Sequence, residues 1–317
     1  MQQKKFRQLT ERKSRRVIPD SFWVALAIIL LSTLPYFHDI ITDSDGIKGW
    51  VPNLGIESLL TDANGKVHGF STYRVLLYTL LIFSFAAIGM AGWYQSARFK
   101  HYSKALLVVL ISAVYHVLLI VFNLRKTIFD DINLKMILFS ALVLVTSYFS
   151  IKRYGWSVKK IVTWALVYIM AMLPFYHDFI TERGVGLRSW VPVLGIEELL
   201  TDSEGYVRGL GSYRVLVYLF SIYLFSHLGW IGWFFSSEGR KYRPFLLVPA
   251  ALSLYQVILI LMSWRETEFN SPSVNLYISI GLSVLLAINF FYNNKTSPEI
   301  TISQNKRTTI KSKESEN

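Results

Sequence analysis

Residues 50–78 read WVPNLGIESLLTDANGKVHGFSTYRVLLY, and residues 190–218 read WVPVLGIEELLTDSEGYVRGLGSYRVLVY. The two stretches align without a gap and are identical at 19 of 29 positions. A shorter match precedes them, because LPYFHDIIT at residues 34–42 returns as LPFYHDFIT at residues 173–181. This recurrence predicts that the chain is a tandem duplication of one structural unit.

Long apolar segments flank both copies of the repeated stretch. The chain has 317 residues, of which 52% are hydrophobic and only 17% are charged. A membrane-spanning helix needs about 20 consecutive, mostly apolar residues. Eight segments satisfy this requirement: 21–39, 73–94, 104–123, 134–151, 160–178, 213–235, 244–263 and 274–292. Pro35 and Pro174 lie near one end of the first and fifth segments, where we expect each to kink or end its helix.

The positions of the basic residues predict the orientation of these segments. With the N-terminus in the cytoplasm, 22 of the 33 Lys and Arg residues fall on the cytoplasmic side, and 15 of the 21 Asp and Glu residues fall outside. This distribution follows the positive-inside rule. We therefore expect a multi-pass protein of the plasma (inner) membrane with both termini in the cytoplasm. A net charge of +12 is then explained by anionic lipid, and no nucleic-acid partner is expected.

The predicted fold class is an all-α integral membrane protein of about eight transmembrane helices. Because each unit contains four spans, its copies have the same orientation, which gives two parallel four-helix repeats with pseudo-two-fold symmetry along the membrane normal. The predicted organisation is a basic cytoplasmic N-terminus at 1–20, the first repeat at 21–151, a cytoplasmic linker at 152–159, the second repeat at 160–292 and a disordered cytoplasmic tail at 293–317.

The duplicated ionisable and aromatic residues are the candidate site for a ligand or partner. In the first repeat they are His38, Asp39, Trp50, Glu57, Asp62, Arg74 and Arg125, and in the second they are His177, Asp178, Trp190, Glu197, Asp202, Arg214 and Arg265. These residues are expected near the outer boundary of the membrane, where a charge is costly unless it is paired or hydrated. Arg74 is therefore expected to pair with Glu57 or Asp62. The same residues can equally serve to fold two long loops that have no disulfide, because the chain has no cysteine.

The His-Asp pairs are the more informative members of this set. A histidine beside an aspartate can exchange protons, bind a cation or receive an anionic ligand when it is protonated. Whether a metal binds is left open, because the spacing matches no specific metal-ligand pattern. No cofactor motif and no nucleophile motif is present, so no catalytic residue is assigned and the interpretation leans away from an enzyme.

Residues within the spans indicate packing more than chemistry. Gly89 and Gly92, with Gly229 and Gly232, place small residues on one face of the second and sixth spans, which favours close approach of helices. His116, His227 and Gln256 are expected to be hydrogen-bonded in the interior.

Three functions remain open at this stage. The leading hypothesis is a transporter or channel for a small solute or ion, with an external site built by the duplicated loops. The first alternative is a non-catalytic receptor, assembly factor or immunity protein that binds a lipid or protein partner through those loops. The second is a membrane-embedded enzyme acting on an envelope or lipid-linked substrate, for which two copies of one site would be unusual.

Overall fold

Among the residues that the structure describes, eight helices are long and apolar enough to span a membrane. The computed structural model describes residues 20–43, 46–52, 61, 67–68, 70–125, 127–182, 186–191, 201, 207, 210–264 and 267–290. Within these residues the candidate spans are Ser21–Ile41, Tyr73–Ser96, Ser103–Val121, Ile132–Tyr154, Val158–Ile180, Tyr213–Ser236, Arg243–Leu261 and Pro272–Phe290. Every boundary lies within three residues of the prediction. The prediction of a multi-pass, helical membrane protein is therefore confirmed.

The first and fifth spans are interrupted at their prolines, as expected. Helix α2 (Asp20–Ser32) ends before the 3-10 turn η1 (Leu34–Tyr36), and the chain resumes as α3 (Phe37–Ile41). In the fifth span, α8 (Val158–Met172), η3 (Leu173–Phe175) and α9 (Tyr176–Ile180) follow the same order. Proline lacks the N–H that an α-helix needs and its ring crowds the preceding turn, which explains the change of helix type.

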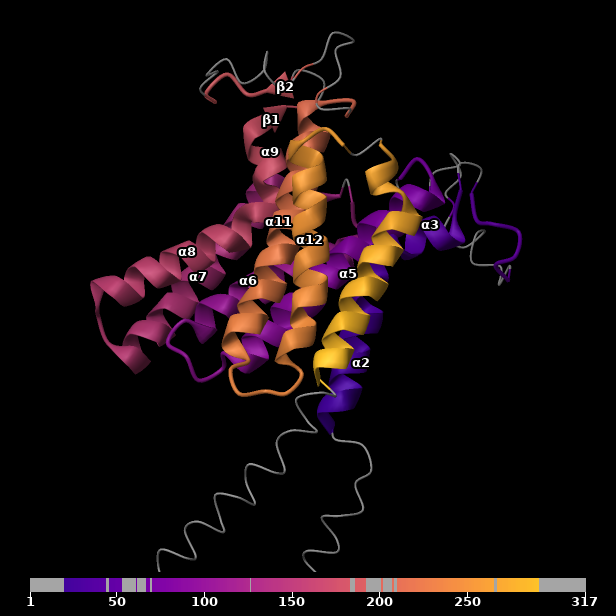
Figure 1. Cartoon of the computed structure of the whole chain (residues 1–317). Coiled ribbons are helices and arrows are strands. Elements are labelled where there is room, and N and C mark those ends of the chain that lie inside the picture. Colours follow the sequence, from indigo (N-terminus) through magenta and orange to yellow (C-terminus); the bar gives the residue numbers. More distant parts are fainter. Residues whose placement is uncertain are drawn as a thin grey trace, which may run out of the picture.

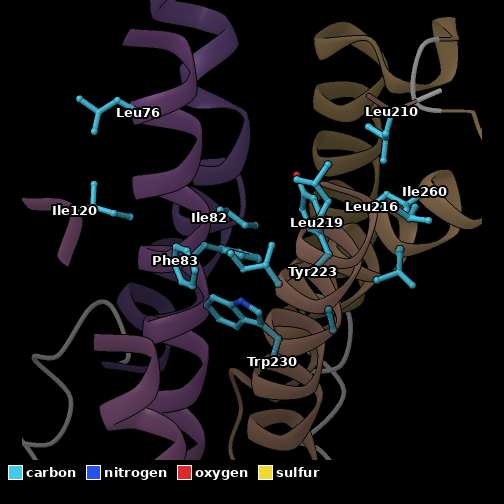
Figure 2. Packing of buried hydrophobic residues seen from close by; sticks show 14 of the residues in the cluster. Leu76, Ile82, Phe83, Ile120, Leu210, Leu216, Leu219, Tyr223, Trp230 and Ile260 are labelled. Atoms are coloured by element: carbon cyan, nitrogen blue, oxygen red, sulfur yellow. The ribbon is translucent and has the colours of Figure 1, made fainter. Parts of the chain in front are cut away.

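Two long helices, α5 (Tyr73–Ser96) and α11 (Tyr213–Ser236), pack along each other at the centre of the bundle. Ile82 and Phe83 on α5 face Leu219, Tyr223 and Trp230 on α11 across this interface (Figure 2). These two helices are the second spans of the two predicted repeats.

Glycines allow the close approach of α5 and α11. A Cβ atom added to Gly92 would lie 2.1 Å from the Trp233 ring, and one added to Gly232 would lie 2.3 Å from the Trp93 ring. Each helix therefore seats a tryptophan of the other against a bare backbone. The expected packing role of these small residues is confirmed.

Six further helices and turns surround the central pair. They are α6 (Ser103–Val121), η2 (Ile128–Asp130), α7 (Ile132–Tyr154), η4 (Arg243–Leu246), α12 (Leu247–Leu261) and η5 (Glu268–Asn270). The helix Pro272–Phe290 completes the bundle. A short antiparallel pair, β1 (Thr181–Glu182) and β2 (Gly186–Leu187), follows α9.

The first span of each half contacts both halves of the chain. The part of each first span that precedes the proline packs on the third span of the other half. Helix α2 packs against α12, and α8 packs against α6. Beyond the proline turn the partner changes, because α3 packs against α5 and α9 packs against α11. Each His-Asp pair, which lies just beyond the proline, is thereby placed where the two halves meet.

The two ends of the bundle differ in chemistry. The start of α2 and the end of the helix Pro272–Phe290 (yellow) lie at one end, which we call the terminal end, whereas α9, β1 and β2 lie at the opposite end, which we call the loop end (Figure 1). At the terminal end, partial burial and then the nearby Lys160, Lys159 and Lys100 lower the pKa of His101. This clustering of cations matches the predicted distribution of basic residues.

Some predicted features lie outside the described residues. These are the basic segment 1–19, the tail 293–317 and the loop segments 53–60 and 192–200. The linker predicted at 152–159 is mostly helical, because α7 ends at Tyr154 and α8 begins at Val158.

Candidate functional site

The proline turn and α3 position the first His-Asp pair. The His38 ring nitrogen Nδ1 lies 2.8 Å from the carbonyl oxygen of Pro35, in the 3-10 turn. The Thr42 hydroxyl donates to the His38 carbonyl at 2.5 Å and ends the short helix. The His38 ring also contacts Tyr78 edge-on, with ring centroids 4.9 Å apart. These contacts fix the ring and direct Asp39 towards α5.

Asp39 pairs with an arginine from the start of α5. The Arg74 guanidinium donates to Asp39 Oδ1 at 2.5 Å, and His38 Nε2 lies 3.3 Å from the same oxygen. The Lys48 ammonium donates to the Asp39 main-chain carbonyl at 2.7 Å. The partners expected for Arg74, Glu57 and Asp62, lie outside the described residues, so that pairing stays a prediction. Arg74 reaches Asp39 because the kinked first span returns to the beginning of the second.

A pocket of about 370 Å³ opens beside this pair, and we call it the Asp39 pocket. Its lining comes from both halves: Tyr36, His38, Asp39, Arg74, Val75 and Tyr78 from the first, and Tyr223, Gln256, Thr267, Asn270, Ser271, Pro272 and Asn275 from the second. Arg74 is half exposed at its rim, whereas Tyr36, Gln256 and Asn275 are buried. Tyr36 packs with the buried Val248 and Leu252 in a small apolar cluster.

An amide network lines the deep side of the Asp39 pocket. The Gln256 side-chain nitrogen lies 3.2 Å from Asn275 Oδ1, 3.3 Å from Asn270 Oδ1 and 3.5 Å from the Tyr36 hydroxyl. The Asn275 side chain in turn donates to the Asn270 carbonyl at 3.3 Å. On the opposite wall the Tyr78 hydroxyl donates to the Tyr223 hydroxyl at 3.0 Å. The lining is thus neutral and hydrogen-bonding except at Asp39, Arg74 and His38.

The second His-Asp pair has the same surroundings from its own half. The Arg214 guanidinium donates to Asp178 Oδ1, and His177 Nε2 lies 3.4 Å from that oxygen. His177 Nδ1 lies 3.1 Å from the Pro174 carbonyl, and its ring contacts Tyr218 edge-on at 4.8 Å. Arg188 donates to the Asp178 main-chain carbonyl at 3.1 Å, as Lys48 does to Asp39.

The pocket beside Asp178 is nearly filled, and we call it the Asp178 pocket. Only about 60 Å³ remains there. The Lys135 ammonium, whose side chain is 3% exposed, lies 2.7 Å from Asp130 Oδ1 and 3.5 Å from Asp178 Oδ2. It also lies 5.5 Å from the centre of the Phe175 ring. A side chain of the first half therefore occupies the space beside the carboxylate of the second.

The structure brings together some of the predicted site residues and separates others. His38, Asp39 and Arg74 meet in one pocket, and His177, Asp178, Arg214 and Arg125 line the other. Arg125 also stacks on Phe70, 4.2 Å from the ring centre. Trp50 and Trp190 are 65% and 63% exposed and line neither pocket. The predicted candidates Glu57, Asp62, Glu197, Asp202 and Arg265 lie outside the described residues.

The interior polar residues are hydrogen-bonded, as expected. His116 Nδ1 lies 2.9 Å from the Ser112 carbonyl, and His227 Nδ1 lies 2.9 Å from the Ala250 carbonyl. Gln256, however, has a larger role than was predicted, because it lines the Asp39 pocket. In the part of the chain that the structure describes, no group of three or more His, Asp or Glu residues is placed to hold a metal ion.

Sequence reasoning missed the residues that distinguish the two pockets. They are Asp130 and Lys135 in the first half and Asn270 and Asn275 in the second. Aligned through the repeat, which is offset by 140 residues here, Asp130 corresponds to Asn270 and Lys135 to Asn275. These residues could have been found from the positions at which the two repeats differ, whereas the prediction relied on the positions at which they are identical.

No known family model, curated protein sequence or solved structure matches this chain.

Proposed function

We propose that this protein is a transporter for a small polar solute and that the Asp39 pocket is its binding site. The observation that carries the proposal is the pocket, about 370 Å³ of space lined mostly by carboxylate, guanidinium, amide and hydroxyl groups within a membrane-spanning bundle. Its volume falls in the range of small-molecule sites. Polar side chains are costly at membrane depth, so where they gather they mark binding sites and solute paths.

The proposal includes an arrangement in the membrane. The loop end faces outward, both termini are cytoplasmic, and the protein resides in the plasma (inner) membrane as two parallel repeats related by pseudo-two-fold symmetry along the membrane normal. Three observations support this arrangement. They are the excess of Lys and Arg on the terminal side, the position of the start of α2 and the end of the helix Pro272–Phe290 at one end (Figure 1), and the matching Asp-Arg contacts of the two halves.

The composition of the pocket walls suits alternating access. The walls come from both halves, and Tyr36 in the lining packs against the buried apolar residues Val248 and Leu252. A rocking movement of one half against the other would therefore change access to the pocket. The interface of α5 and α11, with its reciprocal Gly-Trp contacts, is the axis about which such a movement would occur.

Solute uptake by reconstituted protein tests the proposal. Proteoliposomes are challenged in a stopped-flow instrument with glycerol, glucose, glycine or ethanolamine hydrochloride, and reswelling is followed by light scattering. At least one solute should enter faster than it enters protein-free liposomes, and Asp39→Asn should slow that uptake by about tenfold, which corresponds to ~1.4 kcal/mol. Trp190→Phe, outside both pockets, is the matched control. Rates equal to those of protein-free liposomes for every solute would refute transport of these classes.

A second candidate function follows from the exposed indoles. Trp50 and Trp190 are more than half exposed at corresponding positions of the loop end, and tryptophan is frequent both at lipid interfaces and at the centres of protein contacts. A receptor or assembly protein would dock its partner there. In that case Trp50→Ala or Trp190→Ala would abolish the function, whereas Asp39→Asn would leave it intact.

A further inference from the structure

The Asp39 pocket and the Asp178 pocket occupy corresponding positions but differ in what fills them. In both, an aspartate is held by an arginine of its own half and faces the third and fourth spans of the other half. The facing residues are Asp130 and Lys135 in the Asp178 pocket and Asn270 and Asn275 in the Asp39 pocket. At the two facing positions, Asn270 and Asn275 stand where the other half has Asp130 and Lys135. The linings also differ where Gln256 corresponds to His116 and Tyr223 to Phe83.

The Lys135 ammonium shows what the filled site recognises. Its surroundings are one carboxylate from each half, Asp130 at 2.7 Å and Asp178 at 3.5 Å, and the face of the Phe175 ring at 5.5 Å. Carboxylates and an aromatic face are the groups that stabilise a desolvated ammonium ion. The chain thus supplies its own primary ammonium group to this position.

The Asp39 pocket retains a reduced form of the same surroundings. Asp39 corresponds to Asp178, Tyr36 to Phe175 and Asn270 to Asp130. All three line the open space, together with the buried side chain of Asn275. Asparagine is shorter than lysine and carries no charge, so Asn275 brings no ammonium group into the open space beside Asp39.

We propose that the Asp39 pocket binds a small primary amine, whose ammonium group takes the position that Lys135 Nζ occupies in the Asp178 pocket. The Asp39 carboxylate receives the charge, the side-chain oxygens of Asn270 and Asn275 accept N–H bonds, and the Tyr36 ring lies beneath. The amide and hydroxyl groups of Gln256, Ser271 and Thr267 bind hydroxyl or carboxyl groups on the remainder of the molecule. This inference rests on the proposed function, because it names the class of solute carried.

The charges of the lining favour a cation over an anion or a neutral sugar. Arg74 binds Asp39 through Oδ1, as Arg214 binds Asp178 through Oδ1. In the Asp178 pocket the Lys135 ammonium lies beside the second oxygen, Oδ2, so we expect the amine to bind at Oδ2 of Asp39. An anion would meet Asp39 directly, and like charges at close range are unfavourable in a partly buried site. A neutral polyol could satisfy the amides but would leave the position beside the carboxylate without a cation.

The test compares amines with isosteres that lack the ammonium group. Full-length protein in lipid nanodiscs is titrated with ethanolamine and, separately, with ethylene glycol, and binding is followed by isothermal calorimetry and by the thermal unfolding midpoint. Ethanolamine should bind and raise the midpoint, and ethylene glycol should do neither. Asp39→Asn should weaken ethanolamine binding by about 30-fold or more, the range for removing one partner of a buried charge pair.

Two double variants exchange the facing residues of the two pockets, so that the test does not depend on Asp39→Asn alone. Asn270→Asp combined with Asn275→Lys copies the filled site into the Asp39 pocket, so it should abolish ethanolamine binding while raising the unfolding midpoint of the ligand-free protein. Asp130→Asn combined with Lys135→Asn should open the Asp178 pocket and raise the stoichiometry from about one ethanolamine to about two. If the filled variant bound ethanolamine as the wild type does, or if ethylene glycol bound equally well, the inference would be overturned.

The outcomes separate this inference from the transport proposal. Binding of ethanolamine without uptake into proteoliposomes would refute transport and leave the amine site intact. Uptake of glycerol or glucose without any ethanolamine binding would support transport and refute the amine site.

Discussion

The Asp39 pocket and the Asp178 pocket share their framework and differ in their contents. Each has a proline turn, a His-Asp pair, an arginine from the start of the following span and a tyrosine one turn further along. One holds about 370 Å³ of space and the other about 60 Å³. The residues that position the carboxylate have thus been kept in both copies, whereas the residues that face it have diverged.

This difference indicates how a duplicated site can separate into two roles. In the Asp178 pocket the buried Lys135 joins Asp130 to Asp178 and closes the space. In the Asp39 pocket neutral amides take these positions, so the wall stays hydrogen-bonded while the space stays open. In the proposals above, the closed copy has a structural role and the open one binds the ligand.

The largest expected difference between the two copies concerns the buried lysine. Lys135→Met should lower the free energy of unfolding by about 3–5 kcal/mol, because Asp130 and Asp178 would face each other across the site without their shared cation. The matched change, Asn275→Met, should lower it by about 1–2 kcal/mol through lost amide hydrogen bonds. Thermal unfolding in detergent, followed by tryptophan fluorescence, measures both. Equal losses would contradict a structural role confined to the closed copy.

The two aspartates should also differ in their contribution to stability. Asp178→Asn removes a negative charge that Lys135 and Arg214 share in a closed site. We expect the free energy of unfolding to fall by about 2–3 kcal/mol. Asp39→Asn leaves only Arg74, which is 47% exposed and can be hydrated, so the expected loss is about 1 kcal/mol or less. The unfolding midpoints of the two variants, measured side by side, decide this. A larger shift for Asp39→Asn would reverse the assignment.

The central helix pair should respond equally in the two halves. Gly92→Ala and Gly232→Ala each place a Cβ atom within 2.3 Å of an indole ring of the partner helix. We expect about 1–3 kcal/mol of destabilisation from each, because overpacking forces the rings or the helices to shift. Gly155→Ala, where a Cβ atom meets nothing within 4 Å but φ is +69°, controls for backbone strain alone. Unequal effects at Gly92 and Gly232 would show that the interface is not reciprocal.

The smallest effect on stability is expected at the exposed indoles, which serve to test orientation. The chain has no cysteine, so Trp50→Cys, Trp190→Cys and Trp156→Cys each introduce a single thiol at an exposed position. Stability should change by less than about 0.5 kcal/mol. On intact cells a membrane-impermeant maleimide should label the first two variants and should not label the third. Labelling of only one of Trp50→Cys and Trp190→Cys would exclude parallel repeats.

Much of the fold could be predicted because hydrocarbon imposes a simple rule. Each span must satisfy its own backbone hydrogen bonds and present apolar side chains over about 20 residues, and both properties are local in sequence. The helix interruptions at Pro35 and Pro174 follow from the same local chemistry. The close approach at Gly92 and Gly232 could be anticipated from residue size alone.

The candidate site was only half predictable. His38, Asp39 and Arg74 stood out because they recur, and they do lie together. Lys135 and Asn275 did not stand out, because they are where the repeats disagree. The ion pair of Arg74 with Asp39, which lies 35 residues earlier in the chain, was not anticipated, because the expectation considered only acids of the connecting loop.

The sequence by itself determined that this chain has eight segments long and apolar enough to cross a membrane and that its polar residues recur in two copies, since apolarity and identity can be read position by position. Only the tertiary structure decided which span lies against which, and so which side chain faces each carboxylate. Hydropathy requires that a helix be covered by lipid or protein but does not specify its neighbour. That choice depends on the shapes of side chains distant in sequence, such as a tryptophan over a glycine, and on where a proline turns the helix.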